Sequence, residues 1–218
     1  MKTHTAKRSN FRAMTLTEVL VVIAVLVLLA ALLLPALTAG RSKKLRIDCA
    51  SNLKQVGLAF RLWAGDNNDG FPMRVSVTNG GAMEFALSGN VLPIFQVMSN
   101  GLNTPRLLVC PADKGRVAAK NWSELRGGNI SYFISLGADE TTPQMLLSGD
   151  SNLEVDGKPV GPGILNLSST TAVGWTAARH NRCGNVALGD GSVQQFTTSG
   201  LRQALQQAGT ATNRLAIP

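Results

Sequence analysis

Two residues near the C-terminal end of the chain, His180 and Asp190, invite a catalytic interpretation. A histidine can act as a general base, and a carboxylate can orient its imidazole. That chemistry needs a nucleophile, but no Ser-containing turn of the hydrolase type accompanies the pair, and the only other histidine is His4. Asp190 and Gly191 also stand between two alternating runs, where a hairpin turn favours these residue types. We therefore expect His180, Asp190 and Gly191 to be structural, with His180 capping or bonding the hairpin, and the chain not to be an enzyme.

The three cysteines, Cys49, Cys110 and Cys183, form no CxxC pair and have no histidine at zinc-ligand spacing. The sequence therefore predicts no metal site from them. In an exported domain one disulfide with one thiol left over is one interpretation, and three small buried hydrophobic residues are the other. A Cys49–Cys110 bridge would close a loop of about sixty residues and contribute about 4 kcal/mol in the loop-entropy model. It requires Cα atoms within about 7 Å.

The segment DNNDG (66–70) suggests calcium, because carboxylate and amide oxygens are its usual ligands. Its spacing misses the EF-hand loop, since no glutamate follows at the twelfth position. We expect a plain turn here and no cofactor, with calcium in the head as the alternative.

The formal net charge of +8 first suggests an anionic partner, nucleic acid or anionic lipid. Four Lys or Arg precede residue 14, and four more lie between residues 41 and 46. From Ile47 onward, 13 Lys or Arg stand against 12 Asp or Glu. A nearly neutral globular part lacks the basic face that phosphate binding needs, so we expect no nucleic-acid partner.

Between the two basic groups lies an uncharged run over residues 19–39. It has the length of about 20 residues that a helix needs to cross a bilayer. The apolar core of a removable secretory signal is shorter, roughly 7–15 residues. The run therefore predicts a transmembrane segment at about residues 17–39, with the lipid bilayer as a partner.

Helical patterning continues past this run as an apolar stripe with spacings of three and four residues: Leu45, Cys49, Leu53, Val56, Phe60 and Trp63. The sequence therefore predicts one helix over residues 14–64. Its first half is apolar on all sides, and its second half has a single apolar face. Pro35 lies inside it and should bend it or loosen a turn.

Beyond residue 65 the chain consists of short apolar segments separated by Gly, Asn, Asp and Pro. This pattern predicts a small antiparallel α+β head over residues 65–218. The expected elements are a short helix at 91–99, strands at 106–110, 130–136 and 144–148, a hairpin at 185–196, and a last helix capped by Ser199 and ending at Gly209.

Glu18 stands at the head of the apolar run, where a bare carboxylate costs about 2.5–3.5 kcal/mol at mid-bilayer. It needs a cation, and the nearest fixed ones are Arg12 and a free amino terminus. A cut between Ala13 and Met14 would place a new amine four residues before Glu18. A neighbouring chain shifted along the helix axis would then bring its own amine onto this carboxylate. The alternative is an interfacial glutamate solvated by headgroups.

The segment AMTLTE (13–18), with a basic leader before it and a long apolar helix after it, resembles the class III signal of type IV prepilins and type II secretion pseudopilins. Ala13 stands where the family usually has Gly, and Met14 where it usually has Phe. Pro35 falls where many pilins carry a helix-loosening proline. The resemblance implies that residues 1–13 are a leader removed by prepilin peptidase, that Met14 is then N-methylated, and that Glu18 serves assembly.

The head resembles pseudopilin-like proteins known for processing-associated H-X9-DG motifs. Here His180, nine residues, and Asp190-Gly191 form the signature. Three further segments carry the likeness: 49–72 (CASNLKQVGLAFRLWAGDNNDGFP), 110–113 (CPAD) and 149–152 (GDSN). Some secretion pseudopilins hold calcium in the head.

The resemblance implies a pilin-like α+β fold, in which a long N-terminal helix packs on a small antiparallel sheet. It implies a structural subunit of a type II secretion or type IV pilus-like machine, single-pass in the bacterial inner membrane with its head in the periplasm, assembled into a pseudopilus or surface filament. The implied partners are prepilin peptidase, identical or related pseudopilins and an inner-membrane assembly platform.

Two alternatives remain, an uncut single-pass anchor displaying a binding domain and an anchored enzyme using His180 and Asp190. An uncut anchor has no need for Glu18 or for a small residue before it, so the motif at 13–18 favours the pilin-type subunit.

Overall fold

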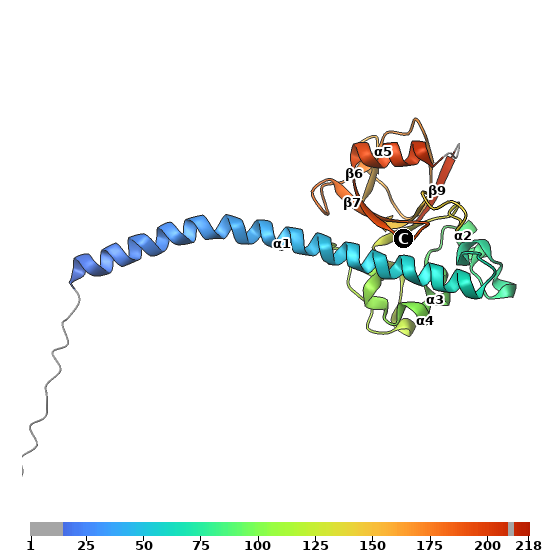
Figure 1. Cartoon of the computed structure of the whole chain (residues 1–218), viewed down its shortest axis with the longest axis horizontal. Coiled ribbons are helices and arrows are strands. Elements are labelled where there is room, and N and C mark those ends of the chain that lie inside the picture. Colours follow the sequence, from blue (N-terminus) through green and yellow to red (C-terminus); the bar gives the residue numbers. More distant parts are fainter. Residues whose placement is uncertain (1–14, 209–211) are drawn as a thin grey trace, which may run out of the picture. The chain divides into compact units, whose positions relative to one another are not determined.

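A computed structural model describes residues 15–208 and 212–218 (Figure 1), without the side chains of residues 34–39. The expected leader, the Ala13–Met14 cleavage site and Gly209 lie outside the described residues, as does the side chain of Pro35. The chain divides into two compact units, Met1–Arg41 and Ser42–Pro218.

Helix α1 (Leu16–Asp66) is continuous over 51 residues, which confirms the single long helix expected from the sequence. Its backbone stays helical through Pro35, so the proline does not end it. In the first unit the side chains of residues 16–33 are exposed on every face. Among the described residues, Leu16–Leu33 is the one helical stretch long and apolar enough to cross a membrane, with a mean hydropathy of 3.0. Such a surface is stable only when lipid or other apolar helices cover it.

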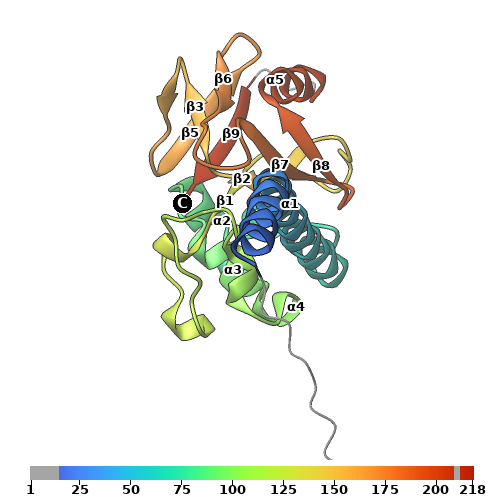
Figure 2. The same cartoon turned by 90° about the vertical axis from the view of Figure 1, so that its left-hand side faces the viewer.

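Within the second unit, α1 buries the apolar stripe that its sequence predicts. Four of its six members, Cys49, Leu53, Val56 and Phe60, are fully buried, whereas Leu45 and Trp63 are half-buried. The four buried residues join a core that also contains residues of the short helices and of the sheet. In both views this part of α1 lies between α3 and α4 on one side and β7 on the other (Figures 1 and 2).

Short helices connect α1 to the sheet: η1 (Pro72–Arg74), η2 (Val77–Asn79), α2 (Met83–Leu87), α3 (Leu92–Val97), α4 (Ser99–Leu102), η3 (Pro105–Leu108), η4 (Trp122–Glu124) and η5 (Gly127–Asn129). Helix α3 confirms the short helix expected at 91–99. The strand expected at 106–110 was wrong, because η3 occupies most of that segment. Pro105 fits the first turn of a helix, and the Thr104 hydroxyl accepts from the Arg106 backbone N–H at 3.4 Å.

A six-stranded antiparallel sheet has the order β5-β9-β1-β2-β7-β8, and a small sheet has the order β4-β3-β6. The strands of the large sheet are β1 (Tyr132–Ser135), β2 (Leu146–Asp150), β5 (Gly163–Ser168), β7 (Cys183–Leu188), β8 (Val193–Thr197) and β9 (Thr212–Ile217). Those of the small sheet are β3 (Leu153–Val155), β4 (Lys158–Pro159) and β6 (Val173–Trp175). The α+β class is thereby confirmed, with β1, β2 and the β7–β8 hairpin where the sequence predicts them.

Helix α5 (Thr198–Gln207) covers a second core with Leu201 and Leu205. Its N-cap is Thr197, whose hydroxyl accepts from the Gly200 backbone N–H at 3.2 Å. The expected cap at Ser199 was therefore wrong, because the helix already begins at residue 198.

The turn between β7 and β8 uses the residues expected for it. Asp190 Oδ1 accepts from the Ser192 backbone N–H at 2.8 Å, and Gly191 has a φ of 82°, in the left-handed region that favours glycine. Arg61 of α1 donates to the Asp190 carbonyl oxygen at 2.8 Å. The hairpin is thus fastened to α1.

The segment 66–70 forms a turn in which Asn68 and Asp69 have φ values of 54° and 58°. The Asp69 backbone N–H donates to the Ala64 carbonyl at 3.0 Å, and the Asn67 side chain donates to the Trp63 carbonyl at 2.8 Å. These bonds satisfy carbonyl groups at the C-terminal end of α1. The segment is therefore a turn, as the sequence predicts.

Candidate functional site

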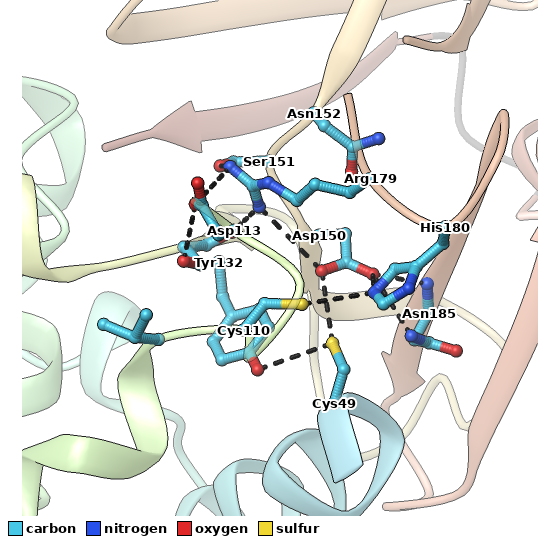
Figure 3. A network of polar contacts seen from close by, with 12 residues as sticks. Cys49, Cys110, Asp113, Tyr132, Asp150, Ser151, Asn152, Arg179, His180 and Asn185 are labelled. Carbon is cyan, nitrogen blue, oxygen red and sulfur yellow. Dashed lines mark hydrogen bonds and ion pairs between the residues drawn. The ribbon is translucent and has the colours of Figure 1, made fainter. Parts of the chain in front are cut away.

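Four side chains from four separate segments meet in the interior of the second unit (Figure 3). Cys49 comes from α1, Cys110 from the loop after η3, Asp150 from the end of β2 and His180 from the turn before β7. Each offers one atom of a type that binds metals, and these four atoms all lie within 4.8 Å of one another. Cys49, Cys110 and Asp150 are 0% exposed, and the His180 side chain is 2% exposed. We call these four residues the buried tetrad.

Direct contacts link the members of the buried tetrad. Cys110 Sγ lies 3.2 Å from His180 Nε2, and the Cys49 thiol donates to Asp150 Oδ1 at 3.3 Å. His180 Nε2 lies 3.5 Å from Asp150 Oδ2. Tyr132 Oη adds a contact of 3.5 Å to Cys49 Sγ. Each of these bonds joins segments that are far apart in sequence, so the tetrad fastens α1 to the sheet and its loops.

The local backbone conformation directs the side chains of Cys110 and His180 into the interior. The Asp113 backbone N–H donates to the Cys110 carbonyl at 2.8 Å, which closes a tight turn. His180 begins a run of three residues in left-handed conformation, with φ values of 49° at His180, 54° at Asn181 and 59° at Arg182. For residues other than glycine this conformation costs about 1–2 kcal/mol each. Strain of this kind persists only where the surrounding structure fixes it, and it is common at functional sites.

A second layer of polar groups holds Asp150 in place. Asn185 donates to Asp150 Oδ2 from its backbone N–H at 2.8 Å and from its side chain at 3.3 Å. The Arg179 guanidinium lies 3.9 Å from Asp150 Oδ1 and 2.6 Å from Asp113 Oδ2. Arg179 and Asp113 also line a cavity of about 380 Å³.

The environment changes the acidity of the tetrad. Burial raises the pKa of the Cys49 thiol well above its ordinary value. The hydrogen bond from Cys49, joined by that of His180, lowers the pKa of Cys110 to about 6 despite burial. Burial disfavours the His180 cation, but the contacts with Cys110 and Asp150 outweigh it and raise the pKa of His180. The lowered pKa favours the thiolate form of Cys110, and the raised pKa favours the protonated form of His180.

The arrangement admits three kinds of chemistry. A thiolate beside an imidazole is the pair that a nucleophilic cysteine needs. Two adjacent thiols are the precursor of a disulfide. Two thiols, an imidazole and a carboxylate are also ordinary ligands of zinc.

The structure separates the residues that the sequence grouped as one signature. Asp190 and Gly191 form the hairpin turn as expected, but His180 contacts Cys110 and Asp150 rather than the hairpin turn. Cys49 and Cys110 lie close together as free thiols, and the bridge between them stays a prediction.

Glu18 forms a contact that the sequence analysis missed. Its Oε2 accepts from the Thr15 backbone N–H at 2.8 Å and from the Thr15 hydroxyl at 2.9 Å. The Glu18 backbone N–H donates back to the Thr15 hydroxyl at 3.3 Å. This is a capping box at the start of α1, and the pattern T-x-x-E could have revealed it.

Sequence reasoning also missed Asp150, Arg179 and Asn185. One signal was present: each of the four head segments that carry the family resemblance contributes one member of the buried tetrad. Comparisons of this chain with protein-family models, curated proteins and solved structures find no match.

Proposed function

We propose that this chain is a structural subunit of the pilin or pseudopilin type, cut by a prepilin peptidase and polymerised through its N-terminal helix. One observation carries the proposal: an exposed apolar segment headed by Glu18 continues without a break into the helix that forms part of the core of the head. A polymer that buries the apolar segments of many chains would remove this surface from water and lipid alike.

The position of Glu18 supports assembly over simple anchoring. Among the described residues, only Thr15 bonds its carboxylate, through Oε2. A carboxylate has acceptor sites on both oxygens, so Glu18 can keep its capping box and still pair with an ammonium group from a neighbouring chain. Within an apolar bundle that pairing would neutralise both charges.

A secretory signal passes the same test of length and apolar composition as a membrane anchor. Removal of a signal near residue 39 would leave the second half of α1 in the head and discard the first half. The proposal therefore depends on where the chain is cut.

The anchored enzyme is the weaker alternative, although Cys110 and His180 lie 3.2 Å apart. A nucleophile must reach its substrate, and Cys110 is 0% exposed. The pair is therefore better suited to a structural role, and we propose no catalysis.

Mass spectrometry of the mature amino terminus, on protein extracted from the membranes of its own host, tests the proposal. We expect a chain that begins at N-methylated Met14. Ala13→Leu should block this cut, because a bulky side chain replaces the small residue of the signal, whereas Thr38→Leu near the end of the apolar run should leave it unchanged. A wild-type chain that begins at Met1, or one trimmed near residue 39, contradicts the proposal.

A further inference from the structure

We propose that the buried tetrad, Cys49, Cys110, Asp150 and His180, is a structural zinc site in the head. This inference rests on the interior of the second unit and is independent of how the chain is processed or assembled. Zinc in structural sites takes four ligands in a closed tetrahedron, drawn from cysteine sulfur, histidine nitrogen and carboxylate oxygen. The tetrad supplies that number and those kinds of atom.

The spacing of the donor atoms fits a zinc tetrahedron. Zinc bonds of about 2.0–2.3 Å place neighbouring ligand atoms about 3.3–3.8 Å apart. Cys110 Sγ lies 3.2 Å from His180 Nε2 and Cys49 Sγ lies 3.3 Å from Asp150 Oδ1, whereas the 3.5 Å contact of His180 Nε2 is with the other carboxylate oxygen, Oδ2. The two sulfur atoms lie within 4.8 Å of each other. The four side chains approach a common centre from different elements, as Figure 3 shows.

A divalent cation would compensate the charge of two thiolates in the tetrad. Zinc and two thiolates together are neutral. Two carboxylates, Asp150 and Asp113, lie near two guanidinium groups, Arg179 and Arg116, which are 2.6 Å and 3.6 Å from Asp113 Oδ2. A third guanidinium group, that of Arg46, donates to the His180 carbonyl oxygen at 3.2 Å. Buried charges are tolerated when they are paired or coordinate a metal, and zinc would meet this condition for the two thiolates and Asp150.

The surroundings provide the outer-layer support that metal sites require. Asn185 fixes the Asp150 carboxylate with two hydrogen bonds, at 2.8 and 3.3 Å. Groups of this kind orient the ligands and account for 10–100-fold in metal affinity. A metal bond would also explain the left-handed conformation of the three residues that begin at His180. It would offset the backbone strain that accompanies the inward position of the imidazole.

A disulfide between Cys49 and Cys110 is the main competitor. It would account for the two cysteines but not for the buried His180 and Asp150 beside them. Zinc accounts for all four residues, and its binding releases the thiol protons to solvent. The site would tie α1 to β2, to the loop after η3 and to the turn before β7.

The test uses the full chain, extracted in detergent from its host without chelators and without a histidine tag, since a tag of that kind binds zinc. We expect about one zinc ion per chain by elemental mass spectrometry. Replacement by Co²⁺ should give the visible absorption of a tetrahedral thiolate complex. Cys49→Ser and Cys110→Ser should each lose the metal, whereas Cys183→Ser, which removes the cysteine outside the tetrad, should keep it.

A measurement on the unaltered chain guards against variants that do not fold. A strong zinc chelator should lower the thermal midpoint, and added Zn²⁺, but not Mg²⁺, should restore it. Three results would overturn the proposal: reduced protein that takes up no zinc when titrated with it, a Cys49–Cys110 disulfide in peptide maps of the native protein, or equal zinc loss in Cys183→Ser. None of these results bears on cleavage after Ala13, so the proposed assembly role is judged separately.

Discussion

The side chains of Cys110 and His180, 70 residues apart in the chain, meet at 3.2 Å inside the head. Asp190, the other end of the H-X9-DG signature, lies in the hairpin turn and bonds Ser192 instead. The signature therefore has two structural tasks. Its histidine joins the interior cluster, and its Asp-Gly pair builds the turn that Arg61 fastens to α1.

Glu18→Gln separates the charge of Glu18 from its capping role. Glutamine can keep the capping box with Thr15, so insertion, cleavage and head folding should remain intact. Assembly should fail, because the ammonium group of the incoming chain would enter the apolar bundle unpaired. That loss costs about 3–5 kcal/mol, a change in assembly of about a hundredfold or more. Crosslinking or filament yield in the native host measures it.

Thr15→Ala is the matched control for this prediction. It removes the hydroxyl of the capping box, worth about 1 kcal/mol, but keeps the carboxylate. Filament yield should therefore stay near that of the wild type. If Glu18→Gln also assembled like the wild type, Glu18 would be an interfacial glutamate solvated by headgroups.

Gly184→Ala should destabilise the head, because β7 passes directly against a buried tryptophan. A Cβ atom at Gly184 would lie 2.4 Å from two ring carbons of Trp175, which is 0% exposed. Overpacking of this kind costs about 1–3 kcal/mol, so the thermal midpoint should fall by several degrees. Gly65→Ala is the control, since no atom beyond its chain neighbours and the backbone of α1 itself lies within 4 Å of its Cβ position. There alanine should be neutral or stabilising by about 0.5–1 kcal/mol.

Periodicity and punctuation predicted much of the fold. The apolar stripe and the turn at 66–70 predicted a helix over 14–64, and α1 covers Leu16–Asp66. The Gly-Asp-Gly-Ser turn predicted the β7–β8 hairpin. Both signals depend only on residues that are close together in the sequence, so they can be recognised without knowledge of the tertiary packing. The strand expected at 106–110 failed for a local reason as well, because the Thr104 cap and Pro105 favour a helical turn over an apolar strand.

The buried tetrad could not be predicted from spacing. Its members come from four segments, and Asp150 stands 101 residues from the Cys49 thiol that bonds it. Zinc motifs in sequence are recognised by pairs of ligands a few residues apart, which this chain lacks. Only the packing of α1 against the sheet brings the four side chains together, and packing has no periodic signature.

Acid should remove zinc from the site and destabilise the head. Released thiolates and imidazole take up protons, so the affinity should fall by about tenfold per pH unit for each proton bound. The wild type should therefore lose its metal and part of its thermal stability as the pH falls below neutral. Metal content after dialysis at a series of pH values measures the first effect. A metal content that does not change with pH would contradict thiolate ligation.

Asn185→Ala should weaken zinc binding without removing a ligand. The side-chain bond to Asp150 Oδ2 at 3.3 Å is lost, but the backbone bond at 2.8 Å remains, so the carboxylate stays in the site with less restraint. We expect a 10–100-fold decrease in affinity, measured by competition with a chelator at fixed pH. Asn152→Ala is the matched control, because Asn152 is also a buried amide but donates to the Thr176 carbonyl at 3.3 Å instead. Its affinity for zinc should match that of the wild type. Equal affinities in the two variants would mean that Asn185 positions nothing, and that Asp150 is held by the backbone alone or does not bind the metal.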